Sequence, residues 1–167
     1  GRAAGGRTMS ASIAVRSTAS DPPAYRPMRE TDVDAVARVE AELQSHPWTP
    51  GNFRDALTAG NSCWMVESGS DVVAYGVLMM GVGEAHLLTL GVAGARQRAG
   101  LGRAMLEFLM ARAKEFGAEK MLLEVRVSNR PARALYDAAG FLEIGLRRNY
   151  YATAEGREDA IVMGKDL

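Results

Sequence analysis

A glycine loop between a strand pattern and a long helix pattern constrains this chain more than any other feature. Residues 84–92 form a β-prone run, and the loop Gln97-Arg98-Ala99-Gly100-Leu101-Gly102-Arg103 follows it. Residues 101–116 then place apolar side chains at helical spacing, and residues 121–125 form a near-continuous apolar run of the kind found in buried parallel strands. This order predicts a sheet with a parallel centre.

The residues before this loop predict two helices and an antiparallel meander. Residues 31–34 resemble a capping box that opens a helix, which stops before His46-Pro47. Thr49-Pro50 is a second start signal, with proline preorganised for the first helical position, and predicts a helix over residues 52–59. Turn residues separate the β-prone runs, which cover residues 62–67, 72–80 and 84–92.

One more helix and two strands are expected near the C-terminus. Residues 131–139 have a helical pattern that closes at Gly140, and residues 141–146 and 160–164 are β-prone. Strands that meet helices on both sides predict an α/β (α+β) fold, in which helices cover both faces of a mixed central sheet.

Length and composition limit the domain organisation. The chain has 167 residues, of which 47% are hydrophobic and 24% charged, so we expect a single domain over residues 24–167 with a substantial core. Residues 1–23 are rich in Gly, Ala, Ser and Arg and end in Asp21-Pro22-Pro23, which predicts a flexible N-terminal tail. Met9 is a candidate start of the natural chain.

Charge and cysteine content exclude several classes of protein. Lys plus Arg number 20 and Asp plus Glu number 20, so no overall positive field would attract nucleic acid or an anionic membrane. Cys63 is the only cysteine, and His46 and His86 lie far apart, which leaves neither a disulfide framework nor a zinc-ligand cluster. No apolar run approaches the roughly 20 residues of a membrane span. We expect a cytoplasmic protein without a metal, and its oligomeric state stays open.

The glycine loop predicts an anion-binding site. Glycines let the backbone approach a phosphate, and the free N–H groups of the first helical turn point at the negative oxygens. A Walker nucleotide loop is excluded because Gly102 is followed by Arg103-Ala104 instead of Lys and then Ser or Thr. A dinucleotide fingerprint requires Gly or Ala where Met105 stands, but Glu124 imitates its ribose-binding acid, so an NAD-type site stays as an alternative.

Several strings after the loop complete a family pattern. Gln97-x-x-Gly100-x-Gly102, Asn129, Leu135-Tyr136 and Gly140-Phe141 together resemble the GNAT superfamily of N-acetyltransferases, over residues 25–166. Within it, the strings at residues 123–126, 128–129, 147–151 and 156–160 resemble the RimI-type ribosomal-protein-alanine N-acetyltransferases. The chain departs from many relatives at residues 92–96, where Val-Ala-Gly-Ala-Arg replaces Asp-Pro and an aromatic residue.

The resemblance implies a fold and a cosubstrate. In this family a splayed strand pair exposes its backbone to the pantetheine and acetyl group of acetyl-CoA, which assigns cofactor contacts to Leu90, Gly91 and Val92. The loop amides hold the pyrophosphate, and a polar side chain contacts the cofactor arm. Those roles carry over to Arg98, Ala99, Gly100, Leu101, Gly102, Arg103 and Asn129.

Acetyl transfer to an amine assigns two catalytic residues. A protein α-amino group has a pKa of about 7.7 to 8.0, so a carboxylate acting through water can remove its proton near neutral pH. Glu124, at a strand end facing the loop, is the expected base, and Tyr136, a phenol, is the expected acid for the departing thiolate. Taken alone, a partner such as Arg126 also accounts for Glu124, and core packing accounts for Tyr136.

The resemblance therefore implies an acetyl-CoA-dependent N-terminal acetyltransferase that acts by direct attack in a ternary complex. The implied acceptor is the N-terminal alanine of the eighteenth small-subunit ribosomal protein. The alternatives are acetylation of protein lysines or a small amine, and a non-catalytic acyl-CoA-binding sensor.

Other chemically notable residues receive structural interpretations. Arg147, Arg148, Tyr150 and Tyr151 resemble an RNA-binding cluster, but on a neutral chain we interpret them as the rim of an acceptor-peptide site. His86 has no Ser or Cys arrangement near it that would make it the base of a catalytic triad.

Overall fold

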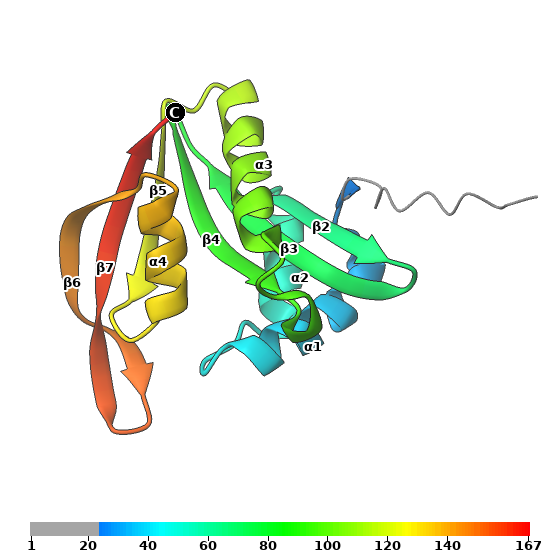
Figure 1. Cartoon of the computed structure of the whole chain (residues 1–167), viewed down its shortest axis with the longest axis horizontal. Helices are drawn as coiled ribbons and strands as arrows, with labels where there is room; N and C mark the ends of the chain where they lie inside the picture. The colour runs from blue at the N-terminus through cyan, green and yellow to red at the C-terminus, as the bar shows by residue number, and fades with distance from the viewer. Residues whose placement is uncertain (1–23) are drawn as a thin grey trace, which may run out of the picture.

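The computed structural model describes residues 24–167, which form a seven-stranded sheet with helices on both faces (Figure 1). The predicted tail over residues 1–23 lies outside the described residues. The elements in chain order are β1 (Tyr25–Pro27), the 3-10 helix η1 (Glu30–Asp32), α1 (Val33–Leu43), α2 (Pro50–Thr58), β2 (Ser62–Ser68), β3 (Asp71–Met80), β4 (Glu84–Val92), the 3-10 helix η2 (Gly94–Arg96), α3 (Leu101–Glu115), β5 (Lys120–Arg126), α4 (Arg130–Ala138), β6 (Leu142–Thr153) and β7 (Gly156–Asp166).

The sheet is mixed, as the hydrophobic patterns predict. Its strand order is β1-β2-β3-β4-β5-β7-β6. Strands β1 to β4 form an antiparallel meander, β4 and β5 pair in parallel, and β5, β7 and β6 continue antiparallel. The parallel pair is joined by α3, so the predicted crossover lies at the centre of the sheet.

Two apolar clusters hold the helices against opposite faces of the sheet. Helices α1 and α2 pack on inward side chains of β2 and β3, as Phe53 of α2 and Met65 of β2 illustrate. Helices α3 and α4 pack on the other face, where Leu106, Leu109 and Tyr136 meet β3, β4, β5 and β7. The prediction of helices on both faces is confirmed. None of the helices within residues 24–167 is long and apolar enough to cross a membrane.

The predicted start signal is confirmed for α2 but not for α1. Thr49 caps α2 as predicted, because its hydroxyl accepts a hydrogen bond from the Asn52 N–H and Pro50 occupies the first turn. The capping box predicted at residues 31–34 is wrong by two residues, because the observed box spans Arg29 to Asp32. The Asp32 carboxylate accepts from the Arg29 N–H, which opens the short η1 helix directly before α1.

Strands β4 and β5 separate toward the carboxyl ends of both strands. Their pairing runs only from Glu84 opposite Lys120 to Leu87 opposite Leu123. A bulge at Leu88, where the register of β3 and β4 shifts, coincides with the end of this pairing. Figure 1 shows the two strands close together near the C-terminus and apart at their other ends. The remainder of β4 therefore keeps main-chain groups without a partner on β5.

The C-terminal hairpin is longer than the sequence predicts. Instead of short strands over 141–146 and 160–164, β6 and β7 form one long hairpin that turns at residues 154–155. The prediction missed it because Asn149, in the left-handed region at φ 51°, interrupts the strand pattern with a bulge. The Asp159 carboxylate and the Arg157 guanidinium bind the main chain of Asn149 and stabilise that bulge.

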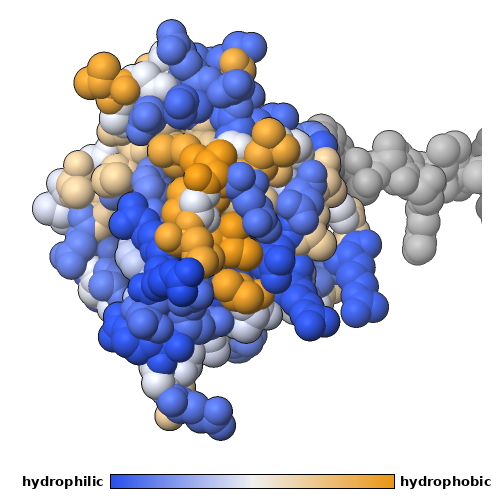
Figure 2. Space-filling model, turned by 90° about the vertical axis from the view of Figure 1, so that its left-hand side faces the viewer, coloured by the Kyte–Doolittle hydropathy of each residue, from blue (hydrophilic) through white to orange (hydrophobic). Residues whose placement is uncertain are grey.

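Strand β6 is the edge of the sheet and is mostly exposed. Figure 2 looks at this side of the molecule and shows an apolar patch surrounded by polar surface. Exposed apolar side chains of β6 on the molecular surface include Leu142, Ile144 and Leu146. These three side chains lie outside the two cavities of the candidate site.

Candidate active site

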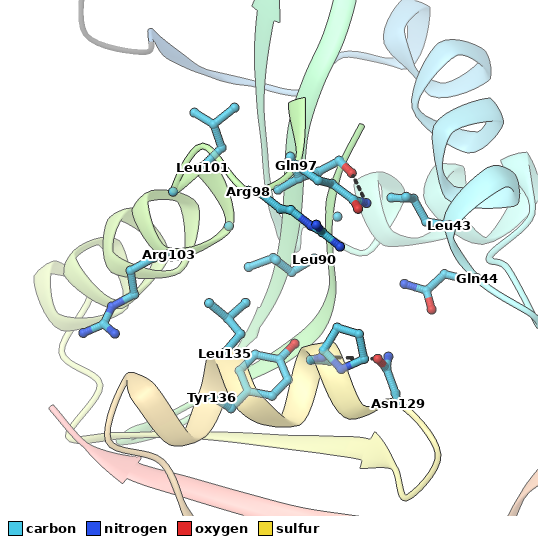
Figure 3. A pocket seen from close by; sticks show the side chains of 16 residues that line it. Leu43, Gln44, Leu90, Gln97, Arg98, Leu101, Arg103, Asn129, Leu135 and Tyr136 are labelled. Carbon is cyan, nitrogen blue, oxygen red and sulfur yellow. Dashed lines mark hydrogen bonds between the residues drawn. The ribbon is translucent and has the colours of Figure 1, made fainter. Parts of the chain in front are cut away.

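A cavity of about 580 Å³ lies between the end of β4, the start of α3 and the start of α4 (Figure 3). It is referred to below as the larger cavity. Ala99 is the one predicted cofactor residue that does not line it. The predicted residues that do are Leu90, Gly91, Val92, Arg98, Gly100, Leu101, Gly102, Arg103 and Asn129.

The glycine loop adopts a conformation suited to an anion. Gly100 caps α3 in the left-handed region at φ 78°, and Arg98 is also left-handed at φ 66°. The Gln97 side-chain amide donates to the Val92 carbonyl over 3.1 Å, which ties the loop to the end of β4. The first N–H groups of a 15-residue helix thus face the larger cavity without helical partners.

The two loop arginines serve different purposes. The Arg103 guanidinium donates to Glu107 over 2.9 Å and to the Ala138 carbonyl over 2.8 Å, so it ties α3 to α4. Figure 3 shows Arg103 directed away from the cavity and Arg98 directed into it. The positive side chain available to a bound anion is therefore that of Arg98, whereas Arg103 contributes main chain.

Asn129 has one half of its side-chain amide occupied. Its carbonyl oxygen accepts from the Ala132 N–H over 3.2 Å and caps α4. The side-chain NH₂ group remains for a ligand, and Asn129 lines both the larger cavity and a second one. A cofactor contact from Asn129 is thus compatible with its role as a helix cap.

The second cavity measures about 160 Å³ and opens beside the larger one. It is referred to below as the smaller cavity. Its walls come from α1, the α1–α2 loop, the splayed parts of β4 and β5, α4 and β6. Residues lining both cavities are Gln44, Leu90, Asn129, Ala132 and Tyr136.

Glu124 lines the smaller cavity, and its carboxylate is held at both oxygens. Oε2 lies 2.8 Å from Nε2 of His86, and Oε1 lies 3.4 Å from Nε of Arg147. The Glu124 side chain is 14% exposed. The anticipated structural partner, Arg126, pairs with Glu158 instead, at 3.0 Å. The sequence interpretation missed His86, although the parallel register of its strand and alternation of side chains could have placed it near Glu124.

Tyr136 lies on the wall between the two cavities. Its side chain packs beside Phe141, with ring centroids 5.8 Å apart, and the residue is 8% exposed. Burial, and secondarily the proximity of Tyr151, raises the pKa of the Tyr136 hydroxyl above its ordinary value. The hydroxyl therefore keeps its proton throughout the neutral range and can donate it to a group in either cavity.

Residues from three places in the sequence, within the strings that resemble RimI-type enzymes, hold the β6–β7 hairpin beside the smaller cavity. The Arg126 guanidinium and the Ser128 hydroxyl both donate to the Glu158 carboxylate. The same guanidinium lies 4.3 Å from the centre of the Tyr151 ring. Burial, and secondarily the charge of Glu124, raises the pKa of Tyr151 to about 12. The hairpin thus brings Tyr151 into the wall of the smaller cavity and Arg147 to the Glu124 carboxylate.

Glu40 is a further residue of the site, and no pattern in the sequence points to it. It is 2% exposed and the only buried charged residue within residues 24–167. Its carboxylate accepts hydrogen bonds from the Tyr75 hydroxyl, the Thr89 hydroxyl and the Trp48 N–H. Because Trp48 lies in the α1–α2 loop and Thr89 in the splayed part of β4, Glu40 joins two walls of the smaller cavity.

The chain is similar in sequence to known proteins of one family. Residues 28–141 match the Acetyltransferase (GNAT) family. The ribosomal protein bS18-alanine N-acetyltransferase of Escherichia coli strain K12 is 36% identical over 136 residues, which cover 81% of this chain and 92% of that protein. The enzyme of the same name from Haemophilus influenzae is 32% identical over 133 residues, which cover 79% of this chain and 90% of that protein.

A solved structure gives the same result at the level of the fold. The crystal structure of the ribosomal-protein-S18-alanine N-acetyltransferase from Escherichia coli matches with a TM-score of 0.80 and 34% identity, over 87% of this chain and 94% of that chain. The family match covers the glycine loop, the catalytic candidates and the walls of both cavities, apart from the contribution of the β6–β7 hairpin to the smaller cavity. The chain therefore belongs to the GNAT acetyltransferase family.

Proposed function

We propose that this chain transfers an acetyl group from acetyl-CoA to the α-amine of an N-terminal alanine on a small-subunit ribosomal protein, as its RimI-type relatives are named for doing on bS18. One observation carries the proposal. Tyr136 forms part of the wall common to the two cavities, and Glu124 lines the smaller one. A donor in the larger cavity and an acceptor in the smaller one would meet between an acid and a base.

The larger cavity suits acetyl-CoA. The first-turn amides of α3 and the Arg98 side chain would hold the pyrophosphate, and a Cβ at Gly102 would fill space beside Val92 and Leu135. The main chain of β4 at Leu90 to Val92, which pairs with β3 but not with β5, would bind the pantetheine amides as a neighbouring strand would. When bound, acetyl-CoA supplies the acetyl group as a thioester.

Glu124 supplies the base. The acceptor enters as an ammonium and must lose a proton before its nitrogen can attack. With a pKa of about 7.7 to 8.0, an α-amine gives up that proton at little cost near neutral pH. The Glu124 carboxylate accepts the proton directly or through one water molecule, and the smaller cavity holds the amine beside it.

Tyr136 supplies the acid. As the nitrogen bonds to the acetyl carbon, the bond from that carbon to sulfur breaks and sulfur leaves with the electron pair. The Tyr136 hydroxyl donates a proton to sulfur, so CoA departs as a thiol. The attacking nitrogen, which is positively charged once the new bond has formed, gives up its extra proton to the resulting Tyr136 phenolate. The acceptor therefore departs as a neutral amide and Tyr136 is restored. Because burial raises its pKa, Tyr136 is fully protonated before the step. The transfer is direct and forms no covalent intermediate with the protein.

Mass spectrometry of peptides tests the proposal. The panel contains peptides that begin with Ala, Ser, Gly or Met, and an Ala peptide with a blocked amine and an internal lysine. We expect acetylation of the free Ala peptide with acetyl-CoA and none of the blocked peptide. Acetylation of the internal lysine would instead favour a lysine acetyltransferase. Tight binding of acetyl-CoA without turnover of any amine would favour a sensor.

A further inference from the structure

His86 and Glu124 meet where β4 and β5 begin to separate. His86 is opposite Leu122 in the parallel register, and Leu87 and Leu123 form the last pair. Alternate residues of a strand share a face, so His86 lies on the same side of the sheet as Leu122 and Glu124. The 2.8 Å contact between His86 Nε2 and Glu124 Oε2 joins the strands just beyond their last main-chain pair.

The chemistry of the two groups fixes the direction of this hydrogen bond. An ionised carboxylate only accepts, so Nε2 of His86 carries the proton and donates it. Neither cavity, as residues 24–167 form it, is lined by His86, whereas Glu124 lines the smaller one. His86 therefore reaches a bound acceptor only through Glu124.

His86 constrains the Glu124 carboxylate more tightly than its other partner does. Arg147 is 54% exposed, comes from the edge strand β6 and lies 3.4 Å from Oε1. His86 is 25% exposed and belongs to β4, an interior strand paired with β3 at Met79. Exposed ion pairs of long side chains hold their partners weakly, because ordering those side chains costs entropy. The orientation of the Glu124 carboxylate is thus set mainly by His86 of β4.

We propose that His86 is a positioning residue for acetyl transfer. The inference rests on the proposed function, since it requires Glu124 as the base. Donation from Nε2 holds Oε2 in place and leaves carboxylate lone pairs free for the acceptor's proton.

Other titratable and charged groups surround Glu124. Arg147 contacts it from β6, and the groups that share the smaller cavity are Glu40, His46, Arg126, Tyr136 and Tyr151.

Steady-state acetylation of an Ala-initiated peptide at pH 8 tests the proposal in wild type, His86→Gln and His86→Leu. Glutamine places an amide donor near the position of Nε2. We expect His86→Gln to keep kcat within about threefold of the wild type. We expect His86→Leu to lower kcat by about tenfold or more, a part of what a general base supplies. The acetyl-CoA Kd and the melting temperature should stay near wild type in both.

Three outcomes overturn the proposal while leaving the proposed function intact. The first is wild-type kcat in His86→Leu. The second is an equal loss of kcat in His86→Gln and His86→Leu, which would mean that the donor at Nε2 is not what matters. The third is a further loss of kcat when His86→Leu is combined with Glu124→Gln, because a residue that acts only through Glu124 has nothing left to affect. A wild-type protein that acetylates no peptide overturns the proposed function, and the role of His86 with it.

A spectroscopic measurement separates positioning from a purely structural role. The chain has only 2 histidines, so the ring ¹⁵N signals are readily assigned, with His46 as the internal reference. We expect His86 to carry its proton on Nε2 in the wild type, and its signals to move in Glu124→Gln while those of His46 stay. A His86 ring protonated on Nδ1 alone, or unaffected by Glu124→Gln, contradicts the proposal.

Discussion

The Tyr75 hydroxyl donates a 2.7 Å hydrogen bond to the buried carboxylate of Glu40, and the Tyr75 ring occupies the space that a Cβ on Gly91 would need. The strand that borders the larger cavity is thereby packed against the network that holds the smaller one. We expect Gly91→Ala to displace the ring and to cost about 1–3 kcal/mol, the usual range for overpacking. Thermal melting measures the loss.

The matched control for that prediction is Gly94→Ala, since a Cβ on Gly94 meets no atom within 4 Å. It should melt like the wild type. A Gly91→Ala protein as stable as Gly94→Ala would mean that the Tyr75 ring has room to move, and that the two cavities are not coupled through it.

Gly102→Val should weaken acetyl-CoA binding without unfolding the protein. A Cβ at Gly102 meets Val92 and Leu135 at 3.6 and 3.7 Å, which is ordinary contact, but a branched side chain would also extend over the first-turn amides. Loss of hydrogen bonds to a charged group costs about 1.5–3 kcal/mol, so we expect Kd to rise by roughly tenfold or more. Isothermal titration measures it, with Gly102→Ala as the smaller control. Equal affinities in all three proteins would exclude these amides from the binding site.

Glu124→Gln should lower kcat most at low pH. Without the carboxylate, the reaction depends on amine that is already deprotonated, and that fraction rises toward the α-amine pKa of about 7.7 to 8.0. We therefore expect partial recovery of kcat from pH 6 to pH 9 in steady-state assays with an Ala-initiated peptide. A constant deficit across this range, or no deficit, would speak against a base role for Glu124.

Tyr136→Phe should lower kcat at every pH in the same range. Loss of a proton donor removes something like the 10²- to 10⁴-fold of general acid catalysis, and the ring that packs beside Phe141 remains. The Kd for acetyl-CoA and the melting temperature should change little. If the variant instead melts early with kcat preserved, Tyr136 serves packing alone.

Alkaline pH should destabilise the fold through its buried tyrosines. Burial, and for Tyr75 also the charge of Glu40, raises the pKa of Tyr75 and Tyr136 above their values in the unfolded chain. The unfolded chain then loses these protons first as pH rises, so their contribution to stability is intact below about pH 10 and declines above it. Melting temperatures from pH 8 to 11.5 measure the effect. Tyr75→Phe should show a shallower decline, and an identical slope would rule out Tyr75 as its source.

Most of the correct sequence predictions rest on local signals, which are caps, turn residues and short apolar runs. The αL glycine at position 100, the proline at position 50 with its Thr49 cap, and the apolar run within β5 each act within a few residues. Their outcome depends little on the rest of the chain. The loop and the crossover were therefore predictable together with the larger cavity that they border.

The features that the sequence did not reveal depend on distant partners. Strand β1 has three residues and exists through its pairing with β2. The middle of the β6–β7 hairpin is held by Glu158 and Asp159, which bind Ser128 and Asn149. The contact of His86 with Glu124 requires the parallel register of two strands separated by α3. Such contacts depend on the order in which the strands pair, and the patterns of a single sequence do not specify that order.

The two cavities differ in how their walls are encoded. The larger one is bordered chiefly by a continuous stretch from the end of β4 to α4, whereas the smaller one borrows Glu40, Trp48 and Tyr151 from the two ends of the domain. Exchange of the α1–α2 loop and the hairpin between relatives would alter which amine is admitted while the acetyl donor stays the same. The walls are thus separable: the smaller cavity can be reshaped at the two ends of the domain while the stretch that chiefly borders the larger cavity stays unchanged.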